Sequence, residues 1–115
     1  MNSVLANIDQ IRQSYSTQTT SQHKASLGQY FTPTEIAVFM ASLFELKNKK
    51  QYKILDAGAG IGCLSSALLQ KIQDTYPHSS CDVTAVELDK QLIATLQHNL
   101  QMFGPAKLEV CNESF

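Results

Sequence analysis

YKILDAGAGIG, residues 52–62, decides the fold of this chain. The stretch from Tyr52 to Ala57 is mostly apolar and predicts a short strand. The glycines that follow allow a sharp turn, because they carry no Cβ atom. Beyond the turn, apolar residues recur at helical spacing on one face: Leu64, Ala67, Leu68 and Ile72. The sequence therefore predicts a strand, a tight turn and a helix in direct succession.

The same pattern continues toward the C-terminus. Residues 82–88 (DVTAVEL) and 107–111 (KLEVC) predict two more strands. Asp89 can cap a helix between them, and Gly104-Pro105 ends it. Strands and helices that alternate with short joints indicate parallel strands and right-handed crossovers. The predicted fold class is α/β, an incomplete βαβαβ half of a doubly wound parallel sheet preceded by helices.

Those preceding helices are separated by a polar stretch. Val4, Leu5, Ile8 and Ile11 predict an amphipathic helix over about the first 14 residues. Ser, Thr and Gln dominate from residue 14 to residue 26, which predicts a linker. Residues 1–26 are therefore expected to form a helix with a polar linker, and residues 27–115 the main domain. Thr32 and Glu35 have capping-box spacing around Pro33, and predict the start of a second helix. Its apolar residues line one face: Ile36, Phe39, Met40 and Leu43.

Composition limits the function classes. The 115 residues are 43% hydrophobic with a net charge of −1, which fits one folded domain rather than a disordered chain. Nine basic against ten acidic residues exclude a generally basic nucleic-acid-binding surface. Three scattered cysteines, of which Cys63 is more simply a packed residue than a reactive thiol, indicate a reducing compartment and no metal site. With no signal peptide and no membrane-spanning apolar run, we expect a cytoplasmic protein.

Two acidic residues stand beside the glycine loop. Ligands of such sheets lie at the carboxyl ends of the strands, where Asp56 and Glu87 are placed. Glu87 can accept hydrogen bonds from a ribose diol. Asp56 would repel a pyrophosphate but attract an ammonium group, and S-adenosylmethionine carries both an ammonium and a ribose. A glycine turn without a ligand and half of a nucleotide-binding oxidoreductase remain alternatives.

Two motifs together resemble one family. Asp56-Ala57-Gly58-Ala59-Gly60-Ile61-Gly62 resembles the first methyltransferase motif, and Gly28-Gln29-Tyr30-Phe31-Thr32-Pro33 resembles the segment before it in gamma-class adenine-N6 DNA methyltransferases of restriction–modification systems. The resemblance implies a Rossmann-like methyltransferase fold with S-adenosyl-L-methionine as cofactor. It further implies these cofactor-binding residues: Tyr30, Phe31 and Thr32 over the methionine part; Asp56, Ala57, Gly58, Gly60 and Gly62 around the amino-acid end; Glu87 at the ribose; and Leu88 at the adenine.

The resemblance also has two departures. The catalytic (Asn/Asp)-Pro-Pro-(Tyr/Phe) motif does not occur, so no catalytic residue is assigned. In the family an acid often precedes an aromatic residue after the third strand and binds the adenine amine of the cofactor. This chain has Ser114 before Phe115 at that place. Either Asn112 or Glu113 replaces the acid, or the segment is a plain loop.

These departures predict the N-terminal, cofactor-binding part of a longer enzyme. We expect it alone to bind cofactor weakly or not at all and not to methylate DNA. Double-stranded DNA would be bound through parts outside this chain, and a restriction endonuclease is a further partner or fusion to consider. The alternatives are a methyltransferase fragment acting on RNA, protein or a small molecule, and a non-catalytic remnant or interaction module.

Overall fold

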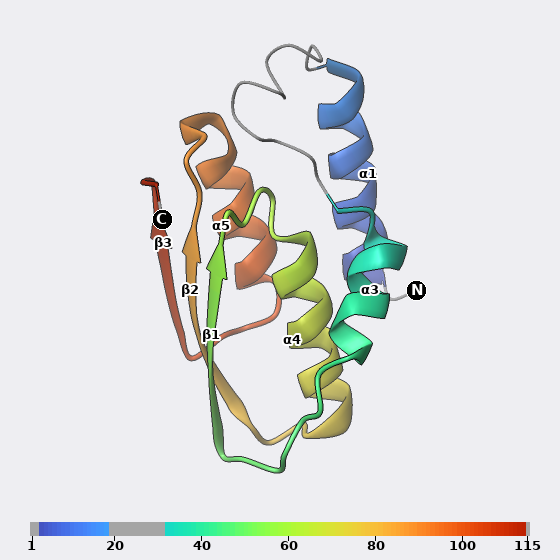
Figure 1. Cartoon of the computed structure of the whole chain (residues 1–115), viewed down its shortest axis with the longest axis vertical. Coiled ribbons are helices and arrows are strands. Elements are labelled where there is room, and N and C mark those ends of the chain that lie inside the picture. Colours follow the sequence, from blue (N-terminus) through green and yellow to red (C-terminus); the bar gives the residue numbers. More distant parts are fainter. Residues whose placement is uncertain (1–2, 19–31, 115) are drawn as a thin grey trace.

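A three-stranded parallel sheet forms one layer of the molecule (Figure 1). The computed structural model describes residues 3–18 and 32–114. The strands β1 (Gln51–Ala57), β2 (Ser80–Val86) and β3 (Lys107–Cys111) lie in the order β1-β2-β3. In their register Ile54 pairs with Val83, and Val83 with Leu108. The predicted fold class is confirmed, because each strand follows its neighbour in sequence and runs parallel to it.

Two helices connect the strands and cover one face of the sheet (Figure 1). They are α4 (Cys63–Thr75) and α5 (Ile93–Gln101), the latter preceded by a 3-10 turn, η1 (Lys90–Leu92). Asp89 caps that turn as predicted, since its side chain accepts the Gln91 N–H at 3.0 Å. The core lies between these helices and the sheet, and its fully buried side chains include Ile61, Leu69, Ile72, Val83, Leu92, Leu96 and Leu100.

An outer layer on α4 consists of α1 (Ser3–Gln18) and α3 (Thr34–Ser42). Leu5 and Ile8 of α1 are 4% and 2% exposed and join the same core as the sheet. The helix extends past the predicted end near residue 14, because helical hydrogen bonding propagates beyond a packed turn at little cost. The predicted boundary at residues 26 and 27 lies outside the described residues and stays a prediction.

The packing face of α3 differs from what its apolar pattern suggests. Ala37 and Ala41 are buried, whereas the large residues of the predicted apolar face are exposed: Ile36 by 51%, Phe39 by 62%, Met40 by 39% and Leu43 by 66%. Small side chains at the contact let the axes of α3 and α4 approach closely. The apolar pattern correctly identified residues that share a face of α3. The face that packs against the rest of the protein is the one that carries the two alanines.

The ends of α3 are held by its neighbours rather than by its own sequence. The predicted capping box of Thr32 and Glu35 does not form. The cap residue of α3 is Pro33, and no side chain of this segment caps the helix. Instead, the Asp9 carboxylate of α1 accepts the Thr34 N–H at 3.2 Å. At the other end, the Lys71 ammonium of α4 donates to the carbonyls of Ala41 and Ser42 (3.1 and 3.4 Å) and of Phe44. Both charges have the sign that the helix dipole favours.

Candidate functional site

The glycine loop between β1 and α4 is folded against the end of β2. Gly58, Gly60 and Gly62 all have positive φ angles, of 75°, 60° and 88°, which L-amino acids with a side chain rarely adopt. The N–H groups of Gly58 and Ala59 donate to the carbonyl of Val86 at 2.8 and 2.9 Å. The alternating glycines are therefore required by the backbone itself, and the loop lies beside Glu87.

Glu87 connects this loop with the next turn of the chain. One carboxylate oxygen accepts the Gly60 N–H and the other accepts the Asp89 N–H, each at 2.7 Å. The residue is only 6% exposed. Each carboxylate oxygen still has a further lone pair for a ligand donor. Glu87 thus lies at the predicted strand end, and it also holds the loop in place, which the sequence did not suggest.

Asp56 lies at the end of β1, directly before the loop. Its carboxylate accepts a hydrogen bond from the hydroxyl of Ser65 in α4. Burial raises the pKa of Asp56, the Ser65 hydroxyl opposes this shift, and the negative charge of Glu87 adds to it. A positively charged group bound near Asp56 would reduce this repulsion.

Two further polar side chains support the site. Asn99 of α5 is 2% exposed, and its amide donates to the Ile61 carbonyl of the loop at 2.9 Å. Asn112, just after β3, donates to the carbonyls of Glu87 and Leu88, both at 3.0 Å. The sequence signal for Asn99 is a polar residue within an apolar helical face, whereas Ser65 gave no comparable signal.

The structure brings together most of the predicted cofactor-binding residues. Asp56, Ala57, Gly58, Gly60, Gly62, Glu87 and Leu88 gather at the carboxyl ends of β1 and β2. Leu88 is 53% exposed and presents an apolar surface there. Thr32 precedes α3 and is partly buried, while Tyr30 and Phe31 lie outside the described residues.

Cys63, which directly follows the loop, is a packed residue. It is 6% exposed, and burial raises the pKa of its thiol to about 11. The neutral thiol is a poor nucleophile at physiological pH. Within residues 3–18 and 32–114 no cluster of His, Cys, Asp or Glu could hold a metal ion. No helix in the same part of the chain has the length and hydrophobicity needed to cross a membrane.

Comparison with known proteins agrees with this geometry. Residues 35–111 match the family described as "Putative S-adenosyl-L-methionine-dependent methyltransferase". The chain is 40% identical over 82 residues to the type II methyltransferase M.BsuBI of Bacillus subtilis and 35% identical over 63 residues to the type II methyltransferase M.PstI of Providencia stuartii. These matches cover 71% and 55% of the chain, but only 16% and 12% of the two relatives.

A solved structure has a similar fold. The modification subunit of a "putative type I restriction enzyme" from Vibrio vulnificus superposes with a TM-score of 0.64, covering 99% of this chain and 25% of that one, at 15% identity. The two type II relatives confirm the resemblance to methyltransferases of restriction–modification systems. The matched family model, the fold and the loop geometry agree, and the chain belongs to the S-adenosyl-L-methionine-dependent methyltransferases.

Proposed function

We propose that this chain is the cofactor-binding part of a DNA methyltransferase that transfers a methyl group from S-adenosylmethionine to adenine N6. The observation that carries the proposal is the pair of carboxylates next to the glycine loop: Asp56 at the end of β1, and Glu87, which accepts a hydrogen bond from Gly60 of the loop. The names of the type II relatives support the methyltransferase class, and the segment of residues 28–33 favours the adenine-N6 group.

The arrangement of the described residues fits this cofactor. A Cβ atom at Gly58 would meet nothing within 4 Å, so the loop is open on that side. Ser65 hydrogen-bonds one oxygen of Asp56, and we assign the ligand's ammonium to this carboxylate, together with the backbone of Ala57 and Gly58. The ribose hydroxyls are assigned to Glu87, because its oxygens retain acceptor capacity. The adenine ring is assigned to the exposed Leu88.

The remaining assignments follow from the resemblance. Tyr30, Phe31 and Thr32 would cover the methionine part of the cofactor. Asn112 is the stronger substitute for the missing adenine-binding acid, because its amide N–H groups already bind the backbone around Glu87 and its oxygen can accept an amine. Residues 27–115 would form this cofactor-binding part.

The sulfonium of the cofactor supplies an activated methyl group. The residues of this chain bind and orient it, and placement of the two reactants is a large share of catalysis in such a transfer. Binding and flipping of the target adenine would be done by parts outside this chain. The longer protein would act on double-stranded DNA in the cytoplasm, in company with a restriction endonuclease.

Cofactor binding is tested by NMR titration of the chain with S-adenosylhomocysteine, because chemical shifts report even millimolar affinity. We expect saturable shifts at Gly58, Gly60 and Leu88. Asp56→Asn should weaken this binding, whereas Asp74→Asn, which changes an exposed acid of α4, should not. Because burial raises the pKa of Asp56, affinity for the ammonium should fall on acidification with a midpoint above 3.8. Because the loop and both carboxylates are formed within this chain, we narrow the expectation of weak or no binding to weak but measurable binding. Equal binding of a nicotinamide dinucleotide, or no binding at all, would therefore contradict the proposal.

The role of this chain in DNA methylation is tested with a chimera. The 82 matched residues of M.BsuBI are replaced by those of this chain, at 40% identity, and DNA from cells expressing the chimera is analysed for methylated nucleosides by mass spectrometry. We expect N6-methyladenine, because this chain would supply the cofactor to the catalytic part of the relative. A folded chimera that leaves the DNA unmethylated would show that the chain does not perform this role. Methylation of DNA by the isolated chain would refute the expectation that catalysis needs parts outside it.

A further inference from the structure

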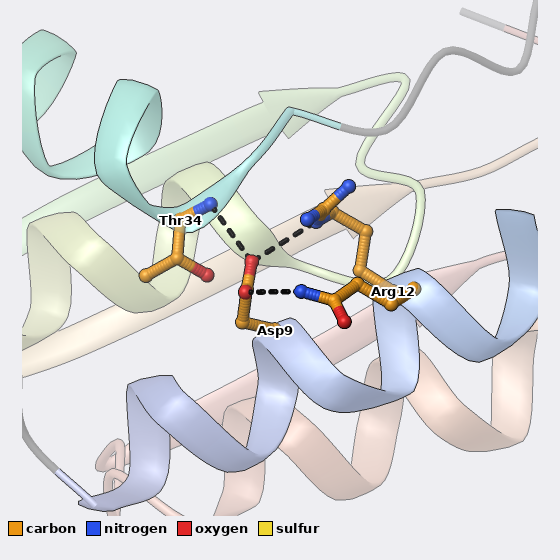
Figure 2. A network of polar contacts seen from close by, with 4 residues as sticks. Asp9, Arg12 and Thr34 are labelled. Atoms are coloured by element: carbon orange, nitrogen blue, oxygen red, sulfur yellow. Dashed lines mark hydrogen bonds and ion pairs between the residues drawn. The ribbon is translucent and has the colours of Figure 1, made fainter.

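The first helix contributes a side chain to the end of α3 nearest the loop. Asp9 of α1 accepts the N–H of Thr34, the first residue of α3, across 25 positions in the sequence. Figure 2 shows the Asp9 carboxylate between the N-terminus of α3 and the guanidinium of Arg12. No side chain adjacent to Thr34 in sequence does this task, because Pro33 is the cap residue and carries no acceptor. The entry of the chain into α3 is therefore fixed from α1.

Asp9 itself is held in place. Arg12 Nε and Gln13 Nε2 each donate to one of its oxygens at 3.0 Å. Burial alone would raise the pKa of Asp9, but the hydrogen bonds from Arg12 and Thr34 outweigh this effect and hold the pKa below its usual value. Ile8, the neighbour of Asp9, is 2% exposed in the core and fixes the helix that carries the acid. The acceptor is thus charged at neutral pH and preorganised.

The helix that carries Asp9 also packs on α4. Cys63 is the first residue of α4 and directly follows the glycine loop. The family match begins at residue 35 and leaves out all of α1. The unmatched helix α1 therefore holds the start of α3 through Asp9, and it packs on α4, the helix that follows the loop.

We propose that Asp9 is a positioning residue of the cofactor site, which holds Thr32 and Pro33 in place over the methionine part of the ligand. The inference rests on the proposed function and adds a contribution from outside the matched family region. The hydrogen-bond partners of Asp9 are Arg12, Gln13 and Thr34, and none of these belongs to the loop. Asp9 acts through the backbone of Thr34, and its loss should change binding of the methionine part alone.

The experiment compares two ligands on two variants by NMR titration of the full chain. S-adenosylhomocysteine has the amino-acid part, and methylthioadenosine has the same nucleoside without it. Asp9→Ala should raise the Kd of S-adenosylhomocysteine about threefold to tenfold, a change of the size that one ordinary hydrogen bond contributes. The Kd of methylthioadenosine should change less than about twofold. Asp9→Asn keeps an acceptor oxygen and should restore most of the affinity, and Asp74→Ala serves as the control for removing an acid from a helix surface.

Amide hydrogen exchange gives a second readout that needs no ligand. Asp9→Ala should accelerate exchange at Thr34 while α5 exchanges as in the parent protein. Equal losses for both ligands would indicate general destabilisation, and unchanged affinity for both would mean that the contact has no role in binding; either result overturns the inference. If the parent chain binds neither ligand, the proposed function falls and the inference falls with it. If the parent binds both ligands and the variants do not discriminate, only the inference falls.

Discussion

Gly62 is a position where a single added methyl group should be costly for stability. Its φ angle is +88°, and a Cβ atom there would lie 3.1 Å from Leu96 Cδ1 and 3.2 Å from Leu100 Cδ2. Gly62→Ala therefore combines two costs. A residue with a Cβ in the left-handed region costs about 1–2 kcal/mol, and crowding of a well-packed core costs about 1–3 kcal/mol. We expect the free energy of unfolding to fall by about 2–5 kcal/mol.

Gly104→Ala is the matched control for this change. Gly104 also has a positive φ angle, +60°, but a Cβ atom there would meet nothing within 4 Å. Only the backbone cost of about 1–2 kcal/mol remains. Urea unfolding followed by circular dichroism gives both values. If Gly62→Ala were no more destabilising than Gly104→Ala, the loop would not pack against Leu96 and Leu100 as described.

Three further predictions concern single side chains. Lys71→Met removes the ammonium that binds the carbonyls at the end of α3 and should lower stability by about 1 kcal/mol in urea unfolding, whereas Lys90→Met, on an exposed site, should change little. Asn99→Ala leaves the Ile61 carbonyl without its partner and should cost about 1–3 kcal/mol and weaken S-adenosylhomocysteine binding; the same losses in exposed Gln97→Ala would contradict this. Burial raises the pKa of Cys63 to about 11, against an ordinary value of 9.0, because the folded state favours the neutral thiol. The contribution of this thiol to the free energy of unfolding should therefore be constant below pH 9 and fall between pH 9 and pH 11 by up to about 2–3 kcal/mol. Urea unfolding at several pH values should show this fall in the parent and not in Cys63→Ala.

The strands, the loop and the positions of Asp56 and Glu87 could be predicted because each depends on local pattern. A parallel sheet brings successive strand ends to one edge, so residues at the ends of two strands become neighbours without any knowledge of packing. The second role of Glu87 could not be predicted in this way. Its hydrogen bond to Gly60 joins residues 27 positions apart and depends on how the loop folds back.

The buried face of α3 was also not predictable from local sequence. Large apolar residues and small ones both recur at helical spacing in this segment, and hydrophobicity alone favours burying the larger set. The close approach of α4 selects Ala37 and Ala41 instead. Asp9 was likewise unpredictable, since its partner Thr34 is reached only because α1 packs on α4.

The apolar outer face of α3 has a consequence for how copies of this chain interact in solution. Phe39, Leu43 and Phe44 are 62%, 66% and 52% exposed, and the net charge of −1 supplies almost no long-range repulsion. The osmotic second virial coefficient should therefore be negative, and ammonium sulfate should make it more negative by strengthening apolar attraction. Static light scattering of Phe39→Lys against the parent measures this directly. Storage at low ionic strength and salting-out as a first purification step both follow from this one helix face.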